Sequence, residues 1–171
     1  MYLYAMIDVY SRYVLGWRLS NTLSARNCYE LLQECIEQHG APEIVNTDQG
    51  SQYTTAEWEQ MLADNHIRIS MDGRGRCKDN IWIERFWRTI KQEHIYLHPT
   101  DDVRTLRLGI GDWIKFYNEQ LPHQSLQGWP CKDVPKGYIS RKRCLFNSRM
   151  FGEGHNRLIS WRWKILKIEH F

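Results

Sequence analysis

The feature that most constrains the fold is the order in which strand-like and helix-like patterns follow one another from residue 1 to residue 128. Two β-rich stretches come first, Tyr2 to Val9 and Tyr13 to Leu19, and the turn-forming residues between them predict a hairpin. Helical and extended patterns then alternate along the chain. Alternation of this kind is typical of an α/β domain in which helices flank a mixed sheet.

Four segments carry the apolar periodicity of helices, and two short extended stretches lie among them. The predicted helices are residues 24–40, from the N-cap Ser24 to Gly40; 54–64, opened by Thr54 and Glu57 at capping-box spacing; 80–94; and 101–119, capped by Thr100. The extended stretches are Glu43 to Thr47 and His66 to Met71. Gly109 and Gly111 each cost about 1 kcal/mol relative to Ala, which weakens the middle of the last helix.

The cysteines argue against a disulfide framework. There are five of them, an odd number, and no CxxC pair occurs. A cysteine-based zinc site is therefore improbable, and a reducing cytosol is the expected compartment. Cys28 and Cys35 lie seven residues apart on a predicted helix, and we expect both in the core because free cysteine is usually buried.

The charge is divided unevenly along the chain. Residues 1–130 hold 13 Lys and Arg against 17 Asp and Glu, whereas residues 131–171 hold 10 against 3. A basic tail on an acidic body indicates an anionic partner, with nucleic acid the first candidate. The alternative is a tail that is simply solvated. No run approaches the ~18 apolar residues that a membrane helix needs.

Two carboxylates stand where a metal site is expected. Asp48 ends an apolar strand and precedes the turn at Gly50, at the sheet edge where open α/β domains bind ligands. Glu84 lies near the start of a helix, with Arg88 and Lys91 on the same face. The competing interpretations are a turn cap for Asp48 and an i,i+4 ion pair between Glu84 and Arg88. A hard cation such as Mg²⁺ would bring the two carboxylates together.

Five motifs in this order resemble one family. They are Ile7-Asp8-Val9-Tyr10-Ser11-Arg12 with Gly16-Trp17; Thr47-Asp48-Gln49-Gly50-Ser51-Gln52-Tyr53; Ser70-Met71 before a basic glycine loop that ends at Cys77; Asp79-Asn80-Ile81-Trp82-Ile83-Glu84-Arg85-Phe86; and Tyr117-Asn118 followed by Pro122-His123-Gln124-Ser125-Leu126. Residues 1–128 thereby resemble the integrase-type catalytic core of DDE-class bacterial insertion-sequence transposases. That core shares the ribonuclease H-like fold of retroviral integrases.

The resemblance implies a function. Asp48 and Glu84 would be the second and third acidic ligands of Mg²⁺ or Mn²⁺, and the reaction would be phosphodiester cleavage followed by DNA strand transfer. Six cations would contact phosphates: Arg74, Arg76, Lys78, Arg85, Arg88 and Lys91. The implied partners are transposon ends and target DNA, with another copy or an intact transposase in addition. The implied compartment is the bacterial cytoplasm, at the nucleoid.

Two departures from the family pattern accompany the resemblance. The family's first catalytic Asp and the strand that carries it would lie upstream of Met1, so we expect an N-terminally truncated core whose leading strand has an unpaired edge. Asp8 matches a different family position, near the turn. Residues 129–171 form a basic, divergent tail, and a frameshifted end is favoured over an added DNA-contacting segment.

Three functions remain open from the sequence. The first is an active strand transferase, completed by another polypeptide. The second is an inactive remnant that binds DNA or an intact transposase. The third, and least favoured, is an RNA-hybrid nuclease of the same fold.

Overall fold

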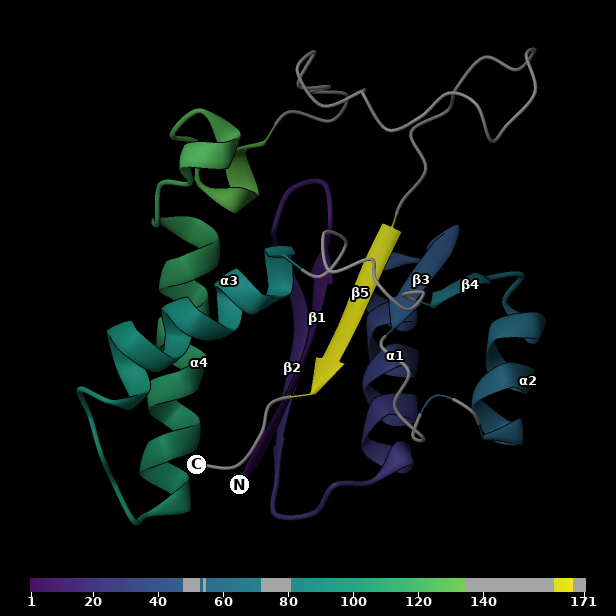
Figure 1. The fold of residues 1–171 in the computed structure, drawn as a ribbon, viewed down its shortest axis with the longest axis horizontal. Helices are drawn as coiled ribbons and strands as arrows, with labels where there is room; N and C mark the ends of the chain where they lie inside the picture. The colour runs from purple at the N-terminus through teal and green to yellow at the C-terminus, as the bar shows by residue number, and fades with distance from the viewer. Residues whose placement is uncertain (48–52, 54, 72–80, 135–161, 168–171) are drawn as a thin grey trace.

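A computed structural model describes residues 1–47, 53, 55–71, 81–134 and 162–167 (Figure 1). Its elements are β1 (Tyr2–Asp8), β2 (Val14–Ser20), α1 (Ala25–His39), β3 (Ile44–Thr47), α2 (Ala56–Asp64), β4 (Arg68–Met71), α3 (Ile81–Ile90), the π-helical turn η2 (Lys91–Ile95), α4 (Val103–Glu119), the 3-10 turns η3 (Gln124–Leu126) and η4 (Cys131–Asp133), and β5 (Arg162–Lys167). The α/β prediction is confirmed. No helix among these elements is long and apolar enough to cross a membrane.

The five strands form one sheet in the order β2-β1-β5-β3-β4. β1 and β2 form the predicted antiparallel hairpin, and β3 pairs with β4 in parallel. β5 comes from the C-terminal region, yet it lies in the centre of the sheet, antiparallel to β1 and parallel to β3 (Figure 1). The expectation of an unpaired edge on the leading strand is therefore wrong, because β1 is paired on both sides.

Alternate residues of β1 feed two hydrophobic clusters on opposite faces of the sheet, as strand geometry requires. The α3/α4 cluster takes Leu3, Ala5 and Ile7 of β1 and packs them against α3 and α4. The α1 cluster takes Tyr4 and Met6 and packs them against α1 and α2. Figure 1 shows α3 and α4 on one side of the sheet and α1 on the other. These five side chains are at most 3% exposed, so β1 contributes buried side chains to both clusters.

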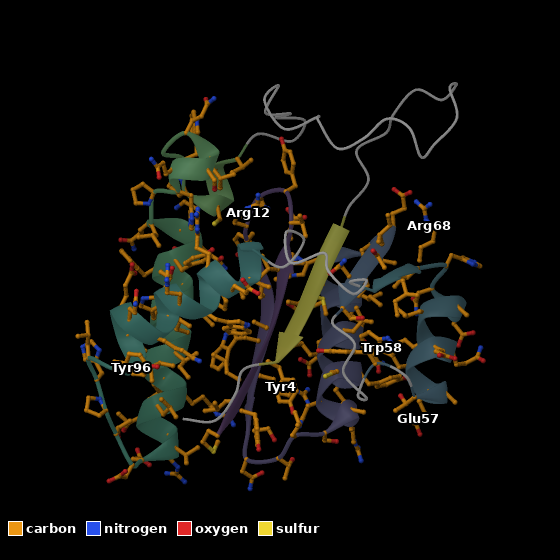
Figure 2. All side chains as sticks on the ribbon, in the orientation of Figure 1. Tyr4, Arg12, Glu57, Trp58, Arg68 and Tyr96 are labelled. Atoms are coloured by element: carbon orange, nitrogen blue, oxygen red, sulfur yellow. The ribbon has the colours of Figure 1, made fainter. Side chains whose placement is uncertain are left out.

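The predicted burial of α1 and α2 is confirmed. Cys28 and Cys35 are 0% and 1% exposed, and both belong to the α1 cluster. Burial raises the pKa of the Cys35 thiol to about 12, so it stays protonated and unreactive at neutral pH. On α2, the buried Trp58 points inward from the helix, whereas Glu57 points outward (Figure 2).

Two helices, α2 and α4, are capped by residues other than the predicted ones. α2 is capped by Thr55, whose hydroxyl accepts a hydrogen bond from the Trp58 amide. α4 is capped by Asp102, whose carboxylate accepts from the amides of the second and third following residues, and Thr100 instead supports Asp102 through its own hydroxyl. An ionised carboxylate is the stronger acceptor at a helix N-terminus, where the backbone dipole is positive.

The two glycines inside α4 lie where other elements press against the helix. A Cβ at Gly109 would fall 2.7 Å from Nε2 of His94, and one at Gly111 would fall 3.3 Å from Cζ2 of Trp17. The absence of side chains lets the π-helical turn and β2 approach the α4 backbone. α4 is therefore continuous through both glycines, because close packing offsets their poor helix propensity.

Side chains occupy much of the outer edge of β2, the edge strand of the hairpin. The Asn118 amide, from α4, donates to the Val14 carbonyl at 3.0 Å and accepts from the Val14 amide at 2.8 Å. His39 of α1 donates to the Leu15 carbonyl at 3.1 Å, and Arg107 of α4 reaches the Leu19 carbonyl at 3.4 Å. Backbone groups that an edge strand normally leaves unpaired are thereby used internally.

Candidate functional site

The candidate site is built around the start of α3. Ile83, Phe86 and Ile90 are at most 1% exposed and belong to the α3/α4 cluster, which fixes the rotation of the helix about its axis. The residues between them, Glu84, Arg85 and Arg88, are exposed. The helix therefore presents one carboxylate and two guanidinium groups to solvent from its first two turns.

These charged groups are not used within the described part of the chain. The described residues form four ion pairs, and none of them includes Glu84, Arg85 or Arg88. The ion pair between Glu84 and Arg88, predicted as the competing interpretation, is not formed. Since these three side chains form no ion pair with another described residue, the described part of the chain leaves them available to a cation and an anion from outside.

β3 lies in the other half of the sheet, separated from β1 by β5. Val45 and Thr47 are 0% exposed, and Val45 lies in the α1 cluster. Ile44 and Asn46 are only half-buried and occupy the opposite face. The Asn46 amide donates to the Ser70 hydroxyl on β4 at 3.3 Å. The sheet face that carries α3 is thus less covered at β3 than at β1.

Several predicted site residues lie outside the described residues. These are Asp48, directly after β3, and the loop cations Arg74, Arg76 and Lys78. Of the remaining three cations, Arg85 and Arg88 are exposed on α3, and Lys91 is half-buried on the π-helical turn that follows. The spatial relation between Asp48 and Glu84 therefore stays a prediction. Among the described residues, no cluster of three or more His, Cys, Asp and Glu residues is suited to hold a metal ion.

Asp8 serves the hairpin turn. It is 2% exposed, and its Oδ2 accepts hydrogen bonds from the Ser11 amide at 2.7 Å and the Ser11 hydroxyl at 2.6 Å. Arg12 follows with a φ of 66°, in the left-handed region. This is the arrangement of a capped turn, so Asp8 caps the turn between β1 and β2.

A buried polar cluster lies between this turn and the end of α4 (Figure 2, where Arg12 is labelled), and the sequence did not reveal it. The rings of Tyr117 and His123 meet edge to face at 4.7 Å, and Cys131 is buried beside them. Burial raises the pKa of Tyr117, and it raises the pKa of Cys131 to about 12, while Arg12 opposes both changes. Burial also lowers the pKa of His123. The cluster anchors the Tyr117 to Leu126 motif against the hairpin.

Comparisons with known families agree on one domain type. A family model described as "Integrase core domain" matches residues 1–77, and a second model with the same description matches residues 65–130. Together they span most of the described core.

Curated relatives are insertion-sequence transposases. The transposase for insertion sequence element IS904 of Lactococcus lactis is 34% identical over 141 residues, covering 80% of this chain and 55% of the relative. The transposase InsF for insertion sequence IS3A of Escherichia coli is 36% identical over 98 residues, covering 56% of this chain and 34% of the relative. The chain thus spans about half of the first relative and about a third of the second.

Solved structures with the same fold are viral integrases. The catalytic core domain of the HTLV-2 integrase, solved in complex with magnesium in a dimeric form, superposes with a TM-score of 0.60 at 18% identity, covering 77% of this chain and 82% of that one. A chain of the simian T-cell lymphotropic virus intasome superposes with a TM-score of 0.67 at 13% identity, covering 93% of this chain and 59% of that one. At these identities the likeness shows the fold.

Proposed function

Because the chain belongs to the integrase core domain family, we propose that it binds DNA and carries out metal-dependent phosphodiester cleavage and strand transfer in DNA transposition. Its curated relatives are transposases, and the site at the start of α3 has the groups that such chemistry needs. The proposed metal ligands are Asp48 and Glu84, and the proposed partners are transposon-end and target DNA.

The observation that carries the proposal is the burial pattern of β3. Val45 and Thr47 lie on the α1 side of the sheet, and Ile44 and Asn46 lie on the α3 side. Asp48, the next residue, lies outside the described residues, and strand alternation leads us to expect its side chain on the α3 side. That is the face against which α3 packs, with Glu84 exposed in its first turn. The proposal therefore places two carboxylates that are distant in sequence, Asp48 and Glu84, on one face of the sheet.

The residues fit a hard divalent cation. Carboxylate oxygens are the ligands that Mg²⁺ prefers, and Glu84 has no ion pair among the described residues to compete for it. When bound, such an ion lowers the pKa of an attacking water and neutralises charge on a transferring phosphate. The protein's own contribution is positional, because the packing of Ile83 and Phe86 holds the Glu84 backbone in place.

Cations next to the carboxylates would hold the DNA backbone. Arg85 and Arg88 are exposed on the same helix as Glu84, and both guanidinium groups are able to form paired hydrogen bonds with phosphate oxygens. Contacts of this kind supply affinity and orientation without sequence specificity. Arg74, Arg76, Lys78 and Lys91 are proposed to extend this surface.

The decisive experiment is a strand-transfer assay on terminal-repeat DNA with Mg²⁺, paired with calorimetric Mn²⁺ binding to the protein alone. Glu84→Gln should abolish product and weaken Mn²⁺ binding at least tenfold. Glu59→Gln, which removes an equally exposed carboxylate from α2, should leave both unchanged. Equal product and equal Mn²⁺ affinity in Glu84→Gln and the unaltered chain would reject the site.

One observation favours DNA binding without cleavage as a second candidate. β5 pairs with both β1 and β3 in the centre of the sheet, and its sequence holds Arg162, Lys164 and Lys167 but no carboxylate. The central strand thus adds no acidic ligand to the proposed pair. DNA binding that needs Arg85 and Arg88, with no cleavage in Mg²⁺ or Mn²⁺, would identify this function.

A further inference from the structure

The outward face of α4 carries an apolar side chain that the fold does not bury. Ile110, Ile114 and Tyr117 of this helix lie in the α3/α4 cluster. Leu108 lies on the opposite side of the helix and is 70% exposed, the highest value among the large apolar side chains of the described residues. A single exposed leucine is common on protein surfaces. The neighbours of Leu108 on the helix are what give it significance.

Leu108 stands between two exposed side chains of opposite charge, Arg104 and Asp112. Residues four apart on a helix form a ridge on its surface, so Arg104, Leu108 and Asp112 make up one ridge, which we call the α4 ridge. Neither charged group forms an ion pair with another described residue. The two lie about 12 Å apart along the helix axis, too far to pair with one another.

The surface beside the α4 ridge is hollowed between α4, β2 and α1. The cavity has a volume of about 630 Å³, and the residues of α4 that line it are Arg107, Leu108, Gly111 and Asp112. Gly111 has no side chain, and a Cβ at this position would lie 3.3 Å from Cζ2 of Trp17. The glycine thus leaves a groove beside the α4 ridge that is open to a side chain from another molecule.

A second copy of the α4 ridge is complementary to this surface. In the commonest packing of two helices, the i±4 ridge of each lies in the groove beside the ridge of the other. If two copies of α4 meet antiparallel about a two-fold axis near Leu108, residues equally far before and after Leu108 come together. Arg104 of each copy then lies near Asp112 of the other. The two Leu108 side chains pack together at the centre.

The next turns on both sides extend the match. Lys115 lies seven residues after Leu108, and Asp101 lies seven residues before it, and both are exposed. The same two-fold axis brings Lys115 of one copy toward Asp101 of the other. Neither residue has an ion pair within the described part of the chain. A parallel arrangement would instead place like charges together, so the charge order favours the antiparallel dimer.

The mixed charge of the α4 ridge argues against a partner of a single charge. The phosphates of DNA would attract Arg104 but repel Asp112. The anionic surface of a membrane would do the same. A second copy of this chain offers each of these residues an opposite charge at the same time.

We propose that the α4 ridge is a self-association surface, through which two copies of this chain form a dimer with antiparallel α4 helices. The proposal does not depend on the metal site, because no residue of the ridge is among the proposed metal ligands or phosphate contacts. One helix from each copy forms a smaller interface than a permanent dimer has, so we expect the dimer to dissociate on dilution.

Paired charge reversals on the full-length chain test the proposal. Arg104→Asp brings carboxylates together across the two-fold axis, and Asp112→Arg brings guanidinium groups together. Each variant alone should associate at least tenfold more weakly than the unaltered chain. Sedimentation equilibrium at roughly 10 μM to 1 mM protein and ~0.1 M salt measures the association. An equal mixture of the two variants should regain the affinity of the unaltered chain, because every contact in the mixed dimer again joins opposite charges.

A third variant tests the apolar centre of the interface. Leu108→Gln should weaken association at least tenfold, because it removes the apolar contact on the two-fold axis. The free energy of unfolding, measured in urea, should hardly change, since the Leu108 side chain is 70% exposed. Lys132→Asp is the control, because it reverses an exposed charge on η4 and should leave association unchanged.

Four results would overturn the proposal. The first is an unaltered chain that stays monomeric at roughly 1 mM. The second is a dimer that neither Leu108→Gln nor Arg104→Asp weakens. The third is a mixture of Arg104→Asp and Asp112→Arg that associates no better than either variant alone. The fourth is DNA binding without a dimer, weakened by Arg104→Asp and strengthened by Asp112→Arg, which would assign the α4 ridge to nucleic acid.

Discussion

The Asn118 amide offers the sharpest test of how the α4 end holds the hairpin. Asn118 is 5% exposed and lies 104 residues from its partner Val14. Its side chain accepts from the Val14 amide at 2.8 Å and donates to the Val14 carbonyl at 3.0 Å. Asn118→Ala removes both hydrogen bonds and leaves two backbone groups without partners at a site where Val14 is 3% exposed.

The expected magnitude follows from these two orphaned groups. Each buried backbone group left unsatisfied costs about 1–3 kcal/mol, so the free energy of unfolding should fall by about 2–6 kcal/mol. Urea unfolding followed by tryptophan fluorescence measures the change, with the m-value as a check that the unfolded state is unaltered. Asn27→Ala is a matched control, because its amide bonds Ser20 and Thr22 at the surface, and it should cost less than ~1 kcal/mol.

Asn118→Asp separates the hydrogen bonds from the packing. It keeps the size of the side chain and the acceptor for the Val14 amide, but it places a carboxylate oxygen against the Val14 carbonyl. Its loss of stability should match or exceed that of Asn118→Ala. A loss below ~1 kcal/mol in both variants would refute the reasoning, since it would mean that water or a shift of β2 satisfies Val14 at little cost.

Three further predictions concern packing, pH and DNA. Gly16→Ala should destabilise the fold by about 1–3 kcal/mol in urea unfolding, because its Cβ would lie 2.6 Å from Cys35 Sγ, and adding Cys35→Ala should restore most of the loss. Burial lowers the pKa of His123 from its ordinary 6.5, so the unfolded chain binds a proton more readily than the folded chain. The free energy of unfolding should therefore be highest above pH 6.5 and fall as the pH drops below it. His123→Gln should reduce this dependence of the free energy of unfolding on pH. Replacing Arg85 and Arg88 together by Ala should weaken DNA binding and reduce the slope of log K against log salt by about 2, and an unchanged slope would count against phosphate contacts.

Local patterns in the sequence were sufficient for most single elements. The spacing of Cys28 and Cys35 predicted the buried face of α1, and the two β-rich stretches predicted the β1–β2 hairpin, because periodicity and turn chemistry are properties of neighbouring residues. The same reasoning put Glu84 and Arg88 on one face of a helix, and both are exposed on α3. Periodicity is less informative at the start of α4, where the apolar Val103 is 44% exposed in the first turn.

The choice between cap residues was less predictable. Thr100 and Asp102 both suit a helix start, and only the backbone geometry at Asp102 decides which one accepts the amide hydrogen bonds. Gly109 and Gly111 predicted a weak helix from their propensity alone. The sequence does not show that His94 and Trp17 pack closely against these two positions. In the second case the deciding contacts come from other elements of the chain, the π-helical turn and β2.

The amino-acid sequence by itself determined the α/β class, the family, and which carboxylates and cations are candidates for DNA chemistry. Only the tertiary structure decided that Arg162–Lys167 lies between β1 and β3, that Asn118 binds the backbone of Val14, and that Glu84 and Arg88 form no ion pair. The physical reason is that hydrophobic periodicity is set by adjacent residues, whereas the backbone groups that pair strands are the same in every residue except proline. The strand that fills the central position of the sheet is therefore decided by the arrangement of the other strands, and not by its own local pattern.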